Sequence, residues 1–184
     1  MKKISLIVAT TKNWGIGKKN DLPWSIPEDM KHFKEITTWK WNNVVIMWRK
    51  TWDSIPKKFK PLKNRINCVI TRNHTLKIKD NVDIFNSLEE AIKFYWQNKN
   101  IDEIFLIGWW QLYNHALKNN LINKLYITYI EDINWKEIEC DIFIDYIKKQ
   151  NHLNNFKILQ EEEKKQSKNN INNYQFINYM IKKD

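Results

Sequence analysis

The chain has few cysteines, no long apolar run and no segment typical of a signal peptide. Cys68 and Cys140 lie far apart and lack the Cys-x-x-Cys or Cys/His spacing of a metal site, so neither a disulfide framework nor a zinc centre is indicated. No run reaches the roughly 18 apolar residues of a membrane span, and the amino terminus enters a strand-like segment directly. We therefore expect a soluble, cytoplasmic, metal-free monomer with one domain over residues 1–184.

Arginine is scarce although the chain is basic. The formal net charge is +10, but the only arginines are Arg49, Arg65 and Arg72. Lysine is spread along the whole chain, as codon bias would spread it, whereas duplex-binding proteins concentrate charge on one face and use arginine for bidentate base contacts. This pattern argues against a nucleic-acid partner. It also makes each arginine a candidate for recognising a planar anion.

Glycine is scarce relative to ordinary usage, with 3 glycines against 10 tryptophans. Eight tryptophans stand at turns, helix ends or strand ends, where glycine is favoured: Trp14, Trp39, Trp41, Trp48, Trp96, Trp109, Trp110 and Trp135. We hypothesise that the source organism reads their codon as glycine and that it has been translated here as tryptophan. Trp24 and Trp52 would then remain. The alternative is that all ten are genuine aromatic residues.

Apolar periodicity predicts an α/β fold. Strands are expected at residues 4–10, 44–47, 65–71, 82–85, 103–107, 124–130, 156–162 and 174–181. Helices are expected at about residues 27–38, 49–55, 88–95 and 109–118, with Ser87 and Glu90 at capping-box spacing before the third. We expect a central mixed, mostly parallel eight-stranded sheet flanked by about four helices. Its last three strands, with no helix between them, form an antiparallel C-terminal edge.

A carboxylate falls on the apolar face of the first predicted helix. Ser25 and Glu28 have capping-box spacing, and Pro27 suits a first helical turn. The positions i, i+3, i+4 and i+7 are occupied by Ile26, Asp29, Met30 and Phe33. A buried carboxylate at Asp29 would need hydrogen-bond donors, so a ligand with paired N–H groups is one candidate partner. The alternative is a solvated Asp29 that complements the helix dipole.

Five blocks, in this order and spacing, resemble the dihydrofolate reductase family over essentially the whole chain. They are Gly15-Ile-Gly with Asn20-Asp-Leu-Pro-Trp24, Pro27-Glu-Asp29 with Phe33, residues 45–55, residues 61–65 and residues 107–113. The resemblance implies NADPH-dependent reduction of 7,8-dihydrofolate to tetrahydrofolate, with hydride transfer to C6 and a proton delivered to N5. The product would support one-carbon metabolism and thymidylate and purine synthesis.

The resemblance also implies the residues that recognise the substrate. Asp29 would accept hydrogen bonds from N3 and the 2-amino group of the pterin, Thr128 would brace it, Trp24 would hold a water, and the loop at Leu22 would limit solvent. The other implied substrate contacts are Ile7, Ala9, Met30, Phe33, Ile55, Leu62, Arg65, Ile107 and Tyr113. Arg65 would grip the α-carboxylate of the substrate's glutamate. The alternatives are a solvated charge at the sheet edge for Arg65 and a core or hinge aromatic for Trp24.

The implied cofactor site lies on other blocks. Its members are Ala9, Ile16, Gly17, Asn20, Trp48, Arg49, Lys50, Thr51, Thr71, Arg72, Gly108, Trp109, Trp110, Gln111 and Leu112. Arg72 would contact the 2′-phosphate and favour NADPH over NADH. The family carries a cis Gly-Gly bond at the positions of Gly108 and Trp109, where an indole would crowd the pyrophosphate. Ile142 also departs from the family, which has threonine after the aspartate that matches Asp141.

Two rival functions remain open at this point. An enzyme of the same fold reduces a ribityl pyrimidine in riboflavin synthesis, but it would lack the Pro23-Trp24 loop and the helix that carries Asp29. A cofactor-binding protein without activity is the second rival. It requires that the eight tryptophans be genuine.

Overall fold

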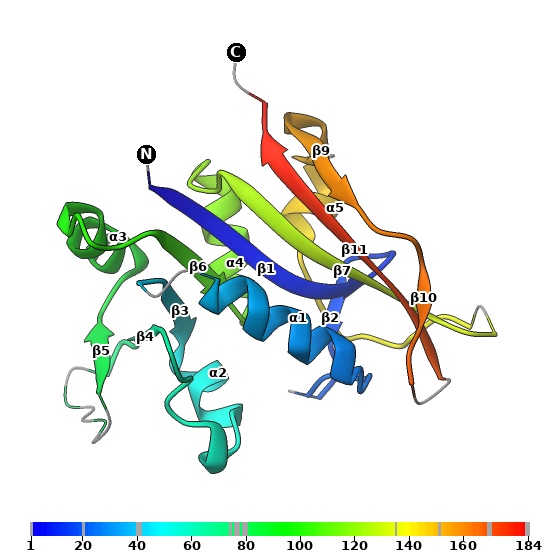
Figure 1. The fold of residues 1–184 in the computed structure, drawn as a ribbon, viewed down its shortest axis with the longest axis horizontal. Coiled ribbons are helices and arrows are strands. Elements are labelled where there is room, and N and C mark those ends of the chain that lie inside the picture. The colour runs from blue at the N-terminus through cyan, green and yellow to red at the C-terminus, as the bar shows by residue number, and fades with distance from the viewer. Residues whose placement is uncertain are drawn as a thin grey trace.

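The computed structural model describes residues 2–19, 21–39, 42–73, 75, 78, 81–134, 136–150, 152–168 and 171–182. Its centre is a nine-stranded sheet in the order β10-β11-β7-β1-β6-β3-β4-β5, with β9 also beside β11 (Figure 1). The strands are β1 (Lys3–Thr11), β3 (Val44–Trp48), β4 (Ile66–Ile70), β5 (Val82–Phe85), β6 (Glu103–Ile107), β7 (Lys124–Asp132), β9 (Phe156–Glu161), β10 (Lys165–Gln166) and β11 (Asn172–Ile181).

The strand directions confirm the predicted sheet. The six strands from β7 to β5 are parallel, whereas β11 runs antiparallel to β7. Strands β9 and β10 share the edge next to β11, because β9 pairs with residues 177–181 and β10 with residues 173–174. The sheet therefore has eight positions and an antiparallel C-terminal edge. The parallel strands read as continuous apolar runs because both of their faces are buried.

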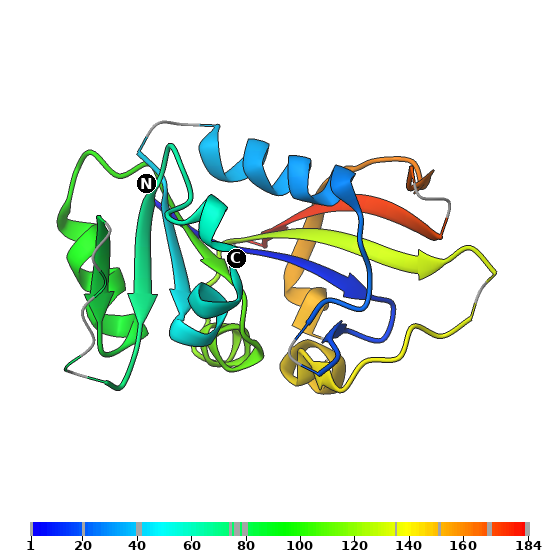
Figure 2. The ribbon, with the colours of Figure 1, turned by 90° about the horizontal axis from the view of Figure 1, so that it is seen from below.

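Helices cover both faces of the sheet. They are α1 (Pro27–Thr38), α2 (Arg49–Ser54), α3 (Leu88–Gln97), α4 (Trp110–Lys118) and α5 (Asp145–Gln150), with 3-10 turns η1 (Lys57–Phe59) and η2 (His152–Asn155). Figure 2 shows α1 on one side of the sheet and α4 and α5 on the other. Packing agrees, since Phe33 and Ile36 of α1 join one apolar cluster while α3, α4 and α5 join another. No helix in the described ranges is long and apolar enough to cross a membrane.

The segment between β7 and β9 corrects one expectation. It was predicted to contain no helix, but α5 and η2 lie there, and β8 (Ile142–Phe143) pairs with β2 (Gly15–Gly17) in a second small sheet. Helix α5 has only six residues, and β2 and β8 have three and two. Segments this short contain too few residues to show a period.

The start of α1 corrects a second expectation. The helix begins at Pro27 as predicted, but its N-cap is Ile26 and no side chain caps it, so the capping box at Ser25 is wrong. The capping box before α3 is confirmed, since Ser87 Oγ accepts from the backbone N–H of Glu90 at 3.1 Å. Proline has no N–H to be capped, which removes one donor from the first turn of α1.

Candidate active site

Helix α1 carries Asp29 over the adjacent strands β1 and β7. Thr128 on β7 donates its hydroxyl hydrogen bond to Asp29 Oδ1 at 2.6 Å. Thr128 is 4% exposed and is the cross-strand partner of Ala9 on β1. The sheet register therefore places Ala9, Thr128 and Asp29 together, as the resemblance implies.

The environment of Asp29 favours the buried interpretation over the solvated one. The side chain is partly buried, and burial raises the pKa of its carboxyl, an effect that the Thr128 hydrogen bond opposes. No ion pair found among the described residues includes Asp29. A carboxylate exposed at a helix N-terminus would instead be stabilised in its charged form. Asp29 is thus a desolvated acceptor without a protein cation.

Trp24 lies in an apolar cluster next to this carboxylate. It is 7% exposed and packs with Ile26, Tyr174 and Phe176, and Ala9 packs against the same cluster. Its Nε1–H is buried and has no acceptor within the described part of the chain. An unsatisfied buried donor costs free energy, so this N–H is available to a water molecule or a ligand.

Leu22 and Met30 differ from the other candidate substrate residues in their exposure. They are 50% and 58% exposed, so neither packs in the core. The apolar face predicted for α1 is therefore not buried at Met30. Helical periodicity gives the direction of a side chain but does not show where the sheet beneath the helix ends.

An apolar wall continues from Asp29 along the same face of the sheet. Ile7 and Ile107 are cross-strand partners on β1 and β6. Phe33, Ile55 and Leu62 pack against the cluster that contains them. The structure thus gathers five of the predicted substrate residues under α1.

Tyr113 links the two central strands of the site. Its hydroxyl donates to the Ile7 carbonyl at 3.1 Å and accepts from the backbone N–H of Gly108. The side chain is 3% exposed, and burial raises the pKa of its phenol well above the usual range. The hydroxyl therefore remains protonated and joins the middle of β1 to the residue that follows β6.

Arg65 lies near the C-terminal end of α1. Its guanidinium carbon is 5.5 Å from the centroid of the Phe33 ring, Nη1 donates to Thr37 Oγ1, and Nε donates to the Lys63 carbonyl at 3.1 Å. Burial lowers its pKa to about 10. Among the described residues no carboxylate forms an ion pair with Arg65. A half-buried cation of this kind is not a solvated edge charge but a candidate receptor for an anion.

Helix α1 fixes the separation between these two charged groups. Asp29 lies in its first turn, and Thr37, which contacts Arg65, lies eight positions further along. A rise of about 1.5 Å per residue gives roughly 12 Å between the two positions. The site therefore offers an acceptor at one end, a cation at the other and apolar side chains between them. Thr37 was not predicted as part of the site, because a threonine near a helix end carries no signal for a distant arginine.

A second set of candidates lies at the carboxyl ends of β3, β4 and β6, which are neighbours in the sheet. Thr51 packs so closely on Gly108 that a Cβ at Gly108 would lie 2.4 Å from the Thr51 methyl group. Lys50 Nζ lies 4.4 Å from the centroid of the Trp109 ring, and Arg72 Cζ lies 5.9 Å from the centroid of the Trp48 ring. Ligands of open α/β sheets bind beyond the carboxyl ends of parallel strands.

Comparison with known proteins identifies the family of the chain. The dihydrofolate reductase family model matches residues 3–181. The chain belongs to the dihydrofolate reductase family. It is 38% identical over 155 residues to a dihydrofolate reductase of Pneumocystis carinii, covering 77% of this chain and 73% of that protein. It is 36% identical over 183 residues to one of Heliothis virescens, covering 94% of each.

Some residues that match the dihydrofolate reductase cofactor site already contact other parts of the protein. The Leu112 side chain is 2% exposed in the core, so any ligand contact there would come from backbone. The Thr71 hydroxyl accepts from the backbone N–H of Asn73 at 3.1 Å, and Arg49 pairs with Asp53. Asn20 lies outside the described residues.

The remaining cofactor candidates lie on β2 and at the start of α4. Ile16 and Gly17 are on β2, Trp110 is the first residue of α4, and Gln111 accepts from Trp109 Nε1–H at 3.0 Å. The cis bond expected after Gly108 is absent, since the cis peptide bond found in the described residues is Lys60–Pro61.

The loop around Ile142 keeps its contact with β2 although the family's threonine is missing. The backbone N–H of Asp141 donates to the Gly17 carbonyl at 3.0 Å, and Asp141 Oδ2 accepts from the backbone N–H of Lys19 at 2.9 Å. These bonds use the backbone and Asp141, so they do not depend on the side chain at position 142.

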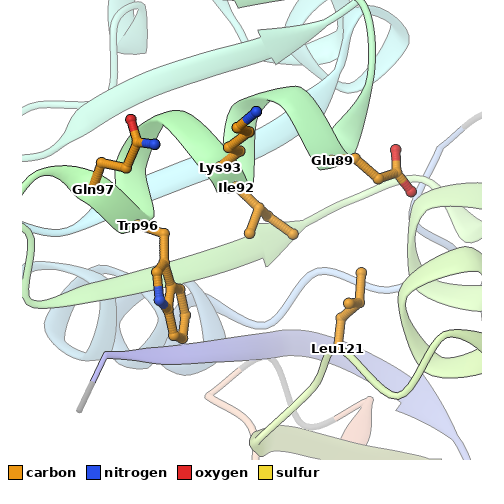
Figure 3. A pocket seen from close by; sticks show the side chains of 6 residues that line it. All are labelled: Glu89, Ile92, Lys93, Trp96, Gln97 and Leu121. Carbon is orange, nitrogen blue, oxygen red and sulfur yellow. The ribbon is translucent and has the colours of Figure 1, made fainter.

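A hollow on another surface contains none of the candidate residues. It has a volume of about 320 Å³ and lies against α3 (Figure 3). Its lining residues are Glu89, Ile92, Lys93, Trp96, Gln97 and Leu121. In the described ranges no group of three or more His, Cys, Asp or Glu side chains is placed to hold a metal ion.

We predict that Asp29→Asn stabilises the protein at neutral pH. The folded state raises the pKa of Asp29, so stability is lost as pH rises from the ordinary aspartate range through the raised pKa. Asparagine removes this cost and can still accept from Thr128. The Tm should rise by a few degrees at about pH 7, since 1 kcal/mol corresponds to roughly 2–4 °C at this chain length.

The rise should shrink in acid, where wild-type Asp29 is protonated. Glu35→Gln, at an exposed position on the same helix, is the matched control and should not raise the Tm. An Asp29→Asn protein that melts at or below the wild-type temperature at neutral pH would show that Asp29 is not desolvated.

Proposed function

We propose that this chain reduces 7,8-dihydrofolate to 5,6,7,8-tetrahydrofolate with NADPH as the hydride donor. Reduction adds a hydride to C6 and a proton to N5, so the double bond between these atoms becomes single and NADP⁺ is released. The observation that carries the proposal is that Asp29 and Arg65 lie near opposite ends of α1. Each is partly buried, and neither has a described partner of opposite charge.

Dihydrofolate has the groups that these side chains lack. N3–H and the 2-amino group of its pterin are two parallel donors that suit the Asp29 carboxylate. The α-carboxylate of its glutamate suits the fork of Arg65. Phe33, Ile55 and Leu62 provide apolar contacts for the p-aminobenzoyl group between them. A separation of roughly 12 Å along α1 requires a long ligand with opposite polar ends.

The proton at N5 is assigned to water. Asp29 binds the opposite edge of the pterin and polarises the ring, so it does not deliver the proton directly. The unpaired Nε1–H of Trp24 is suited to hold a water close to the pterin. Leu22, half exposed on the adjoining loop, would limit access of bulk solvent when substrate is bound.

The cofactor half fits NADPH only in part. The Thr51 side chain packs directly on the backbone of Gly108, and Lys50 and Arg72 are nearby cations that suit phosphate groups. NADPH would supply the hydride when bound there. The indoles of Trp48 and Trp109 lie against those two cations, however, so the residues present do not fit the cofactor without change.

The test of the proposed function is loss of NADPH absorbance on mixing with dihydrofolate. Two proteins are compared, the chain with its ten tryptophans and a version with glycine at the eight anomalous positions. We expect sustained oxidation by the glycine version and impaired or no oxidation by the other. If neither oxidises NADPH in a dihydrofolate-dependent way, the proposed function is wrong.

We predict that Arg65→Lys weakens dihydrofolate binding roughly tenfold, because lysine keeps the charge but cannot form two parallel hydrogen bonds with a carboxylate. Calorimetric titration without cofactor measures this directly. Lys63→Gln is the matched control, since Lys63 is an exposed cation two residues away. A pterin without the glutamate should bind both variants and wild type equally, and a loss for that fragment would contradict the role of Arg65.

A further inference from the structure

We propose that glycine is the functional residue at positions 48 and 109, and that the indoles of Trp48 and Trp109 obstruct the cofactor cleft. This inference rests on the proposed function.

The backbone of Trp109 is the first observation. Its φ is 70° and its ψ is 115°, which lies outside the left-handed helical region of about +30 to +60° in ψ that L residues visit. It directly follows Gly108, whose φ is 69°. Two successive residues with positive φ at the start of α4 suit a Gly-Gly pair, because glycine has no Cβ. A bulky side chain in this conformation is strained.

Trp14 supports the same interpretation of the tryptophans. Five described non-glycine residues have positive φ, namely Trp14, Lys19, Asn64, Trp109 and Asn120. Asparagine is common in this conformation, but tryptophan is not. At Trp14 the evidence is the backbone alone, since its indole is buried and packs edge-on against Tyr129.

The second observation concerns the cations of the cofactor half. Lys50 and Arg72 are exposed at the ends of β3 and β4, where a phosphate-bearing ligand would need them. Each is instead stacked on an indole, Lys50 on Trp109 and Arg72 on Trp48. A cation–π contact competes with binding of an anion by the same cation. Removing both indoles frees both cations at once.

The third observation is that the Trp48 indole is poorly satisfied. Its Nε1–H is buried and no described atom accepts it. Continuing the β3–β6 register, in which Ile46 pairs with Leu106, places Trp48 opposite Gly108. Thr51 already closes on Gly108. Trp48 and Trp109 therefore both stand next to Gly108, where Thr51 leaves no room even for a Cβ.

Positive φ is not found at every anomalous tryptophan that the structure describes. Trp39 has a φ of −51° and Trp96 lies inside α3, so the positive φ expected at these two turn positions is wrong. Trp48, singled out because it ends a strand, has a φ of −70°. Trp41 and Trp135 lie outside the described residues. Trp96 forms one wall of the hollow in Figure 3, so glycine there would open that hollow.

The test is calorimetric titration of NADPH, without dihydrofolate, into the chain with its ten tryptophans and into Trp48→Gly/Trp109→Gly. We expect the double variant to bind NADPH at least roughly tenfold more tightly. Trp39→Gly is the matched control, because it removes an indole that is 82% exposed at the end of α1. It should leave NADPH affinity unchanged. Equal affinity of the double variant and the starting chain would overturn the proposal.

Two further measurements cover the other outcomes. If the double variant does not fold, the version with glycine at all eight positions takes its place, and failure of both to fold or to bind more tightly counts against the proposal. Dihydrofolate titrations separate the two hypotheses, since loss of dihydrofolate binding by every version would reject the proposed function instead. Peptides sequenced from the source organism should contain glycine at positions 48 and 109, and tryptophan there would overturn the proposal.

Discussion

A carboxylate held partly out of water without a cation is the constraint on which the rest of the site depends. Asp29 accepts a hydrogen bond from the Thr128 hydroxyl, and burial raises the pKa of its carboxyl. The folded protein tolerates the free-energy cost of burying Asp29 because other contacts hold α1 over the sheet. Phe33 and Ile36 pack on the apolar cluster below, and Thr37 accepts from Arg65. A ligand with paired donors would relieve the cost, so the energy that destabilises the free protein favours binding.

The sheet order gives the site its two halves. Strand β1 lies between β7, which carries Thr128, and β6, which ends at Ile107 just before Gly108. The face beneath α1 holds the apolar wall and Arg65, whereas the carboxyl ends of β3, β4 and β6 hold Lys50, Arg72 and the two indoles. Tyr113 joins the halves through the Ile7 carbonyl and the Gly108 N–H. The chain belongs to the dihydrofolate reductase family, and we propose that the face beneath α1 binds the substrate and that Trp48 and Trp109 obstruct the cofactor half.

Sequence patterns correctly predicted several structural features that depend on residues close together in the chain. The strands at residues 82–85 and 103–107 begin and end where expected. Periodicity put Asp29 in line with the apolar residues of α1 but left a solvated position open, and the structure decides for the buried one. The contact between Asp29 and Thr128 spans 99 positions, so only the family resemblance suggested it. Helix α5 and the β2–β8 pair were missed because they are short. Contacts such as Arg65 with Thr37 depend on how α1 crosses the sheet, which no local pattern encodes.

The titration of Asp29 itself tests the central claim most directly. Carbon-13 NMR of labelled aspartate side chains, with Asp29→Asn to assign the signal, follows its carboxyl against pH with and without dihydrofolate. The pKa should lie above the ordinary value of about 3.9 in the free protein and fall when dihydrofolate binds, because donated N–H groups stabilise the charged form. An ordinary pKa in the free protein, or one that dihydrofolate leaves unchanged, would contradict a desolvated acceptor waiting for paired donors.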